Sequence, residues 1–218
     1  MAKLEGVVFV GDLTSIISER RSASNFIEGV KIPAEDFNKI FDQLRLAPSC
    51  FNLQHAHYLV VTDTEQKEKL RQVAFNQYKI HTASAAILVL GDIDAYKKAE
   101  NIYSGMLNLG IYKDFEYTKM LQDITGLYES RGIDFQNDEA IRNASLSAMI
   151  FMLLAKDLGW DTCPMIGFDS DKMKELFHIP DNLKPVLLIS MGKEDETKKR
   201  MRGYRKPIGE YVTFQSFK

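Results

Sequence analysis

The stretch NDEAIRNASLSAMIFMLLAKDLGW, residues 137–160, decides how the rest of the chain must fold. It predicts the longest helix of the chain, and its apolar residues fall on two different faces of that helix. A helix that is apolar nearly all round is buried between layers. We therefore expect a second body, a further subunit, to pack over it. One face carries Ile141, Ala144, Ala148, Met152 and Ala155, and the other carries Leu146, Met149, Ile150, Leu153 and Leu154.

Three apolar runs predict the strands that accompany this helix. AAILVLGD, residues 85–92, is continuously apolar and of strand length, which is typical of a strand buried on both faces. HAHYLVVT (55–62) and KPVLLISMG (184–192) are the other two. Because strands alternate with helices, the sequence predicts an α+β sandwich with a central mixed sheet flanked by helices on both faces. The other helical patterns cover residues 12–20, 33–47, 63–75 and 170–179.

The remaining segments bear on domain organisation. Residues 94–136 are polar, helical and rich in aromatic side chains, and their role stays open from the sequence. The end YVTFQSF, 211–217, is strand-like, and we expect it to add a strand that is exchanged between subunits. No repeat, low-complexity segment or Pro/Gly/Ser-rich linker divides the chain. Residues 1–218 are therefore expected to form a single domain.

Bulk properties exclude several classes of protein. The 218 residues carry a net charge of −2, whereas a general nucleic-acid binder is usually basic. The most apolar run, residues 144–155, is shorter than the roughly 20 residues of a bilayer span. The N-terminus MAKLEGVVFVGDL shows no cleavage site of a signal peptide, so we expect a cytoplasmic protein. Cys50 and Cys163 lack metal-ligand spacing, and no metal site is predicted.

The sequence lacks the usual parts for covalent chemistry by its own side chains. The cysteines, serines and four histidines form no local catalytic signature, and each histidine is expected to be structural or exposed. No P-loop is present, and no GxGxxG follows a strand. Either the protein is not an enzyme, or a cofactor performs the difficult step.

Four polar segments remain as candidates for a ligand site. RRSASNF (20–26) and RGYRK (202–206) carry guanidinium and hydroxyl groups that suit a phosphate. APSCFNLQ (47–54) is a polar turn, and CPMIGFD (163–169) places a glycine in a turn whose N–H groups point outward before a helix. Taken singly, the first two are also typical of a solvated charge cluster, and the last two of a plain turn.

Together with FNQYKIHTASAAILV (75–89), and in this order, these segments resemble the nitroreductase family of FMN-dependent NAD(P)H oxidoreductases, from about residue 16 to residue 212. APSCFNLQHAHYLVV is similar to the family's APSxxNxQPWxFxVV segment through Pro48, Ser49, Asn52 and Gln54. The other matches are Arg20, Ser22 and Arg205 at the phosphate, Asn76 and Lys79 in the flavin-ring segment, and Pro164, Gly167, Phe168 and Asp169 in the turn beside the flavin's reactive edge.

The resemblance implies a homodimer with FMN at the subunit interface, each site being lined by both chains. NAD(P)H and an acceptor, a nitroaromatic or a quinone, would use one pocket in turn by ping-pong hydride transfer through flavin N5. The flavin carries the chemistry, and no side chain is expected to be catalytic itself. The implied FMN-binding residues are Arg20, Arg21, Ser22, Ser24, Pro48, Ser49, Asn52, Gln54, Asn76, Lys79, Pro164, Met165, Ile166, Gly167, Arg202 and Arg205.

Three positions depart from the family's pattern. His55-Ala56 replaces the common Pro-Trp, Ile166 stands where many members carry an acidic residue, and Ser24 stands where lysine or arginine is frequent. The physiological acceptor, the choice of NADH or NADPH, and one- or two-electron reduction stay open. A flavin reductase or a reductase of one specialised metabolite is the alternative within the family. A non-catalytic protein that binds flavin or anions is the alternative from another class.

Overall fold

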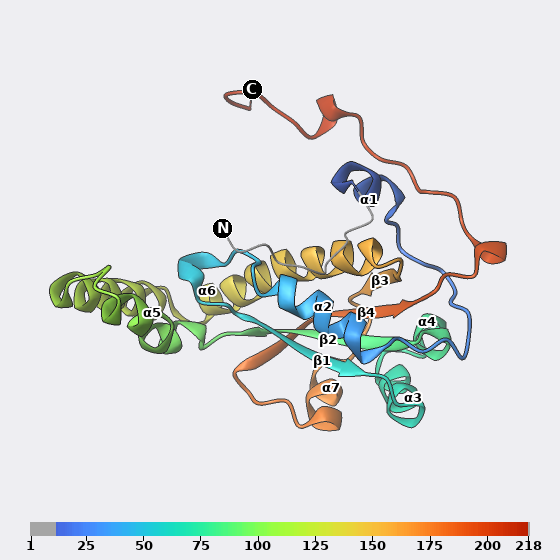
Figure 1. Cartoon of the computed structure of the whole chain (residues 1–218), viewed down its shortest axis with the longest axis horizontal. Helices are drawn as coiled ribbons and strands as arrows, with labels where there is room; N and C mark the ends of the chain where they lie inside the picture. The colour runs from blue at the N-terminus through green and yellow to red at the C-terminus, as the bar shows by residue number, and fades with distance from the viewer. Residues whose placement is uncertain (1–11, 218) are drawn as a thin grey trace.

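Four strands form the central sheet in the computed structural model, which describes residues 12–217 (Figure 1). They are β1 (Ala56–Val61), β2 (Ala85–Asp92), β3 (Asp161–Met165) and β4 (Leu183–Gly192), in the order β1-β2-β4-β3. All three pairings are antiparallel, so the prediction of a mixed sheet is wrong for the described residues. Alternation of strands and helices does not determine strand direction. Short helices connect β1 to β2 and β3 to β4, and in each case the next strand starts at the end of the sheet where the previous one finished, so it runs antiparallel to it.

Helices cover both faces of this sheet, which confirms the predicted α+β class (Figure 1). On one face lie α2 (Ala34–Leu44) and α6 (Asp114–Asp157), and on the other lie α3 (Thr64–Val73), α4 (Tyr78–Thr82) and α7 (Ser170–Phe177). Short 3-10 turns and two further helices complete the described chain. They are α1 (Leu13–Glu19), α5 (Ala99–Asn108), and the turns Cys50–Asn52, Ala95–Lys98, Glu196–Lys198 and Ile208–Glu210.

Strand β2 shows why the sheet is the centre of the core. It is buried along its whole length, as its sequence predicted. Ala85, Ile87 and Val89 pack in the cluster beneath α2 and α6, whereas Ala86, Leu88 and Leu90 pack on the opposite face. Side chains alternate between the faces of a strand, so a continuously apolar run serves two cores at once.

Side-chain caps determine where two of the helices begin. The Asp63 carboxylate accepts a hydrogen bond from the Gln66 backbone N–H at 2.9 Å and starts α3. Asp169 accepts from the Lys172 N–H at 3.1 Å and starts α7, directly after the glycine-containing turn. Each cap satisfies an N–H group that has no partner inside its helix.

Helix α6 is longer than predicted, because it begins at Asp114 and continues through a local break at Gly132, where φ is 71°. Its inner face is buried against the sheet from Ala144 to Ala155, whereas Ile141, predicted on that face, lies at its edge and is 38% exposed. On the outer face Leu146 and Met149 are 47% and 39% exposed in the single chain. The expectation that this helix is apolar on two sides therefore holds, and only one side is covered by the described chain.

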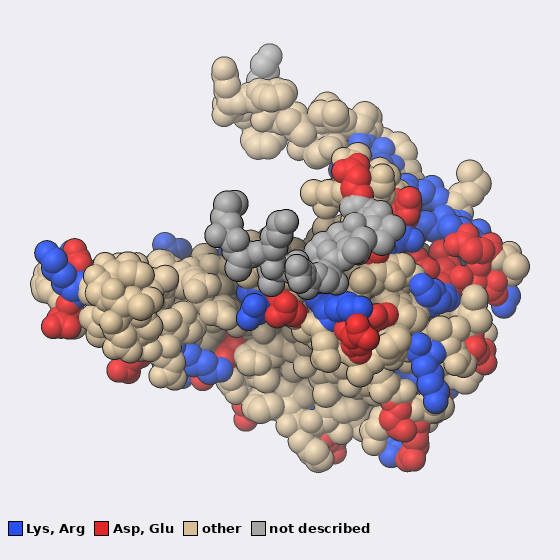
Figure 2. Space-filling model, viewed as in Figure 1, with Lys and Arg blue, Asp and Glu red and all other residues tan. Residues whose placement is uncertain are grey.

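After β4 the chain continues as an extended and mostly exposed arm, residues 200–217, which projects away from the sheet and its helices (Figure 1). In Figure 2 the outer part of this C-terminal arm is largely tan, since its only charge between residues 207 and 217 is Glu210. In the described single chain the arm forms no strand, so the strand expected over 211–217 is not made within one subunit. The arm exposes large apolar side chains at Met201, Tyr204, Ile208, Tyr211, Phe214 and Phe217.

Two expectations concern the membrane and the N-terminus. Over residues 12–217 every helix is too short or too polar to span a bilayer. The expectation about a signal peptide falls on residues 1–11, outside the described part of the chain.

Candidate functional site

Strand β3 brings three of the five motif segments together, and a fourth, RGYRK, reaches them through Arg202, which donates to the Arg20 carbonyl. Its edge away from β4 meets RRSASNF, where Ser22 bridges Thr162 and the Ala23 N–H donates to the Thr162 carbonyl at 3.0 Å. The turn Ile166–Asp169 continues from its end, with Ile166 78% exposed. The sequence predicted only a turn over 163–169, so the strand itself was missed. RRSASNF therefore lies beside β3, and the glycine turn lies at its C-terminal end.

The segment FNQYKI contacts both β3 and the turn that follows it. The Lys79 ammonium, on α4, donates a hydrogen bond to the Cys163 sulfur at 3.1 Å. The Gln77 amide donates to the Gly167 carbonyl at 3.5 Å, and a Cβ at Gly167 would lie 2.6 Å from Gln77 Nε2. A larger residue at 167 would displace the Gln77 side chain from the turn. Asn76, in the left-handed region at φ 57°, is exposed beside them.

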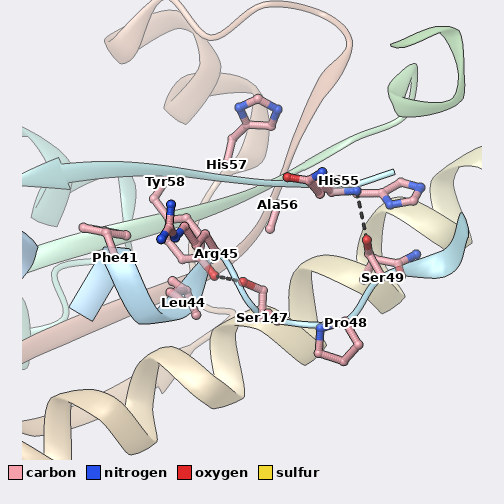
Figure 3. A pocket seen from close by; sticks show the side chains of 13 residues that line it. Phe41, Leu44, Arg45, Pro48, Ser49, His55, Ala56, His57, Tyr58 and Ser147 are labelled. Carbon is pink, nitrogen blue, oxygen red and sulfur yellow. Dashed lines mark hydrogen bonds between the residues drawn. The ribbon is translucent and has the colours of Figure 1, made fainter. Parts of the chain in front are cut away.

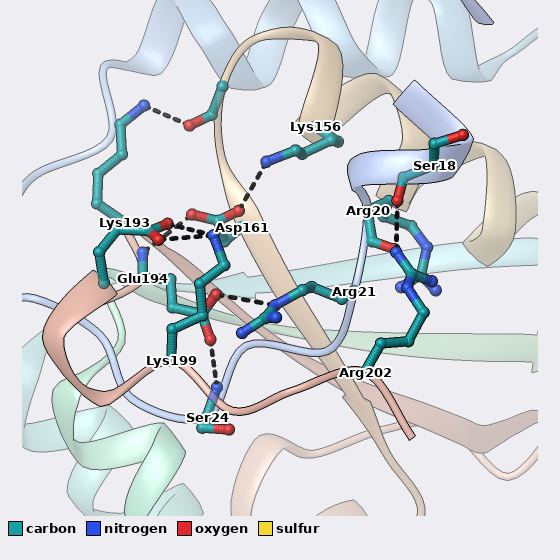
Figure 4. A network of polar contacts seen from close by, with 12 residues as sticks. Ser18, Arg20, Arg21, Ser24, Lys156, Asp161, Lys193, Glu194, Lys199 and Arg202 are labelled. Carbon is teal, nitrogen blue, oxygen red and sulfur yellow. Dashed lines mark hydrogen bonds and ion pairs between the residues drawn. The ribbon is translucent and has the colours of Figure 1, made fainter. Parts of the chain in front are cut away.

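Arg20, Arg202 and Arg205, from the two ends of the chain, come together beside α1, and Figure 4 shows the first two. Arg202 Nη2 donates to the carbonyls of Ser18 at 2.5 Å and Arg20 at 3.1 Å. Burial lowers the pKa of Arg20, and the positive charges of Arg202 and Arg205 lower it further. Guanidinium groups that repel one another are stabilised by an anion placed among them. This cluster therefore fits the phosphate end of FMN.

Arg21 and Ser24 face a different set of partners (Figure 4). Arg21 Nε lies 3.4 Å from the carboxylate of Glu194, which is buried, and the Ser24 N–H donates to the same carboxylate at 3.0 Å. Asp161 accepts from the Glu194 N–H at 3.0 Å and pairs with Lys156. The guanidinium of Arg21 is thus committed to an ion-pair network that fastens the segment to the sheet. This ion pair could not be predicted from the sequence, because Glu194 lies far along the chain from Arg21.

The fifth segment, loop 47–54, lies apart from the other four. It precedes β1, and β1 and β3 are the two opposite edges of the sheet. Three of its residues, Phe51, Asn52 and Gln54, adopt left-handed backbone angles with φ near 50°. Such strain persists only where neighbours hold it. Here the Cys50 N–H donates to Asn143 Oδ1 at 2.7 Å, Tyr103 Oη donates to the Phe51 carbonyl at 2.5 Å, and the Gln54 N–H donates to Ser49 Oγ at 2.9 Å.

A cavity of about 370 Å³ opens beside this loop, between α2, β1 and α6 (Figure 3). Pro48, Ser49 and Arg45 line its mouth, and Tyr58 Oη lies 2.6 Å from Ser147 Oγ on its wall. His55 also lines it, and burial lowers the pKa of this imidazole to about 4, against the opposing pull of Asp92. Its Nε2 lies 3.2 Å from Tyr128 Oη. Sequence reasoning missed Tyr58, Asn143 and Ser147, whose only signal was their place on apolar helices and strands.

Comparisons with known proteins agree with these motifs. The model of the nitroreductase family matches residues 17–193. "Putative NAD(P)H nitroreductase MhqN" of Bacillus subtilis is 52% identical over 205 residues, which are 94% of this chain and 100% of that protein. The crystal structure of "putative nitroreductase ydfN" from Bacillus subtilis has a TM-score of 0.90 at 53% identity and covers 92% of this chain and 97% of that one.

A third relative bears on the cofactor. The structure from Exiguobacterium sibiricum of a "putative nitroreductase in complex with FMN" has a TM-score of 0.86 at 32% identity and covers 96% of this chain and 100% of that one. The fold and the motifs around β3 define a flavin-type oxidoreductase architecture. The chain belongs to the nitroreductase family. The predicted family is thus confirmed, and the predicted cofactor is the one bound in the Exiguobacterium structure.

Proposed function

We propose that this protein is an FMN-dependent oxidoreductase that uses NAD(P)H to reduce nitroaromatics, quinones or similar acceptors. The observation that carries the proposal is that a cluster of three repelling arginines beside α1, a lysine hydrogen-bonded to β3 and the glycine turn after β3 lie near one another, with Arg20 within electrostatic reach of Cys163 of β3. Those groups suit an anion at one end and an electron-rich ring at the other. Residues 1–218 act as one FMN-binding domain in this proposal.

The phosphate end of the site is formed by Arg20, Ser22, Arg202 and Arg205. Arg20 is half-buried and supplies a charge-assisted contact, whereas Arg202 and Arg205 are exposed and come from the start of the C-terminal arm. Two distant parts of the chain are therefore linked through one anion. Cofactor binding should consequently stabilise the arm as well as the segment after α1.

The ring end is formed by Asn76, Lys79 and the turn from Pro164 through Met165 and Ile166 to Gly167. When bound, FMN supplies the chemistry by accepting a hydride from NAD(P)H and passing it to the acceptor. The Lys79 ammonium stabilises negative charge that develops on the pyrimidine, and the N–H groups of Ile166 and Gly167 serve as hydrogen-bond donors at the reactive edge. Donor and acceptor occupy the same space in turn, which gives ping-pong kinetics.

The site is completed by a second copy of the chain in this proposal. Within one chain, loop 47–54 lies at the sheet edge opposite β3, so it is available to a partner's site rather than its own. Pro48, Ser49, Asn52 and Gln54 of that loop line the partner's flavin. The uncovered apolar face of α6, with Leu146 and Met149, supports the same arrangement. A homodimer then carries two FMN sites at its interface.

The C-terminal arm gives a further reason for two chains. Its aromatic end is exposed, and the outer edge of β1 has no neighbouring strand in the described residues. An edge strand with free backbone groups accepts an added strand, and the cavity beside β1 accepts its side chains. We propose that residues 211–217 pair with β1 of the partner.

The proposal is tested by adding FMN to purified FMN-free protein and recording flavin fluorescence and absorption. We expect stoichiometric uptake and bleaching of the flavin band when NADH or NADPH is added without oxygen. A protein that takes up no FMN contradicts the proposal. A protein that takes up FMN but does not oxidise NADH or NADPH with any acceptor is a binding protein instead.

A second candidate keeps the cofactor and changes the acceptor to free flavin or one specialised metabolite. His55 in place of the family's usual proline, and the exposed apolar Ile166 beside the turn, favour it. Steady-state kcat/KM over a panel of nitroaromatics, quinones, enones and free flavins separates the two. One acceptor that exceeds the others by orders of magnitude supports the second candidate.

A further inference from the structure

We propose that Cys163 is a positioning residue for Lys79, and that its buried sulfur holds the ammonium in place at the pyrimidine end of FMN. The inference rests on the proposed function, because Lys79 acts there on the pyrimidine end of FMN. It assigns to a buried thiol the setting of the flavin's reduction potential.

The sulfur is well fixed. Cys163 is 2% exposed and packs in the core cluster with Ile80, Met165 and Met173. Its backbone is held by pairing with Ser190 of β4. The sulfur lies 3.9 Å from the Pro164 carbonyl, to which the thiol donates, so a lone pair is left to accept from Lys79 at 3.1 Å. This hydrogen bond fixes the orientation of the half-buried Lys79 side chain on the short helix α4.

The chemistry of this partner matters because of what it lacks. Among the ion pairs of residues 12–217, none involves Lys79. A carboxylate at the same place would orient the ammonium equally well but would neutralise it. A cysteine sulfur is a weaker hydrogen-bond acceptor than a carboxylate. Lys79 is therefore oriented without a carboxylate ion pair, and its ammonium remains available to the reduced ring.

The same sulfur lies close to the phosphate end. A negative charge on Cys163 would raise the pKa of Arg20, which burial lowers, so the sulfur is within electrostatic reach of that guanidinium. Cys163 thus stands between the cations expected at the two ends of FMN. A carboxylate introduced here would attract both of them away from the cofactor.

The test compares Cys163→Ser, Cys163→Ala and Cys163→Asp with the wild-type protein. Affinity for oxidised FMN is measured by fluorescence quenching, and the two-electron midpoint potential by spectroelectrochemistry. Cys163→Ser keeps an acceptor and should match wild type. Cys163→Ala should keep its affinity for oxidised FMN but bind reduced FMN about tenfold less tightly, which is a fall of about 30 mV. Cys163→Asp should lower the potential further and weaken oxidised FMN as well.

Met173→Ala is the matched control, because it opens a cavity in the same cluster but leaves the hydrogen bond between Lys79 and Cys163 in place. It should lower the unfolding temperature and leave the potential unchanged. Wild-type potentials in both Cys163→Ala and Cys163→Asp, with FMN still bound, overturn the role of Cys163 alone. A wild-type protein that takes up no FMN overturns the proposed function and this inference together.

Discussion

At the scale of residues, Arg20 and Arg21 are neighbours in the sequence with different tasks. Arg20 is repelled by Arg202 and Arg205, whereas Arg21 is paired with buried Glu194. The RRSASNF motif marked both as anion-binding residues, and only the partners of each side chain distinguish them. Sequence alone cannot make that distinction, because the deciding groups come from beyond β4.

Replacing each arginine by alanine should separate the two tasks. Arg20→Ala should weaken FMN binding by about 1.5–3 kcal/mol, since one charge-assisted phosphate contact is lost, without lowering the stability of the FMN-free protein. Arg21→Ala should lower that stability by about 1–3 kcal/mol, because the Glu194 carboxylate is left buried without its cation. Isothermal titration and urea unfolding measure the two effects. Unchanged FMN retention in Arg20→Ala would mean that the phosphate binds elsewhere.

His55 makes the stability of the protein depend on pH. Its pKa is lowered by burial from 6.5 to about 4, so between these values the unfolded chain binds a proton that the folded chain does not. Stability therefore falls as the pH falls through this window, by about 3 kcal/mol in total. In urea unfolding of FMN-free protein at about pH 7 and about pH 4, His55→Gln should lose less stability than wild type by about this amount. Equal losses would show that His55 contributes nothing.

At the scale of elements, the apolar strands were the most predictable parts of the chain. β2 was predicted with its observed bounds, since six consecutive apolar residues, 85–90, followed by Gly-Asp leave few other structures. β3 was missed because its sequence DTCPM contains a proline, which removes a ladder donor. Here Pro164 is tolerated because β3 is an edge strand of the described sheet. The start of α6 was not predicted, because a glycine such as Gly132 usually ends a helix.

The contact between β2 and α6 depends on one glycine. A Cβ at Gly91 would lie 2.6 Å from the backbone carbonyl oxygen of Ala140, so Gly91→Ala must push the helix from the sheet. We expect a loss of about 1–3 kcal/mol in the free energy of unfolding. Gly105→Ala, in α5 with open space around it, is the control and should gain about 0.5–1 kcal/mol. A Gly91→Ala protein as stable as wild type would contradict the close approach.

At the scale of the whole molecule, the sequence indicated that something must cover the outer face of helix 137–160. The structure locates that face and shows the aromatic arm standing away from its own body (Figure 1). Sequence could suggest a partner from the apolar pattern. It could not place loop 47–54 at the edge opposite β3, since that separation depends on the order of strands in the sheet.

Two variants test the proposed dimer. Deleting residues 211–218 removes the exchanged strand, and Leu146→Glu places a charge on the outer face of α6. Each should shift the protein from dimer to monomer in sedimentation velocity and weaken FMN binding by at least about tenfold, because the partner's loop is lost. Asp123→Lys, at an exposed position in the part of α6 before Gly132, is the charge-changing control. A deletion variant that remains a dimer with full FMN affinity would contradict strand exchange.

In the proposed dimer, the division of the motifs between β3 and the loop before β1 has a genetic consequence. One chain can carry Arg20→Ala and another Ser49→Ala with Asn52→Ala, so that each alone forms two damaged pockets. A mixed pair gathers all the lesions in one pocket and leaves the other intact. Random exchange of equal amounts would then restore roughly a quarter of the sites. Two defective alleles of this kind would complement each other in one cell, whereas two lesions around the same β3 would not.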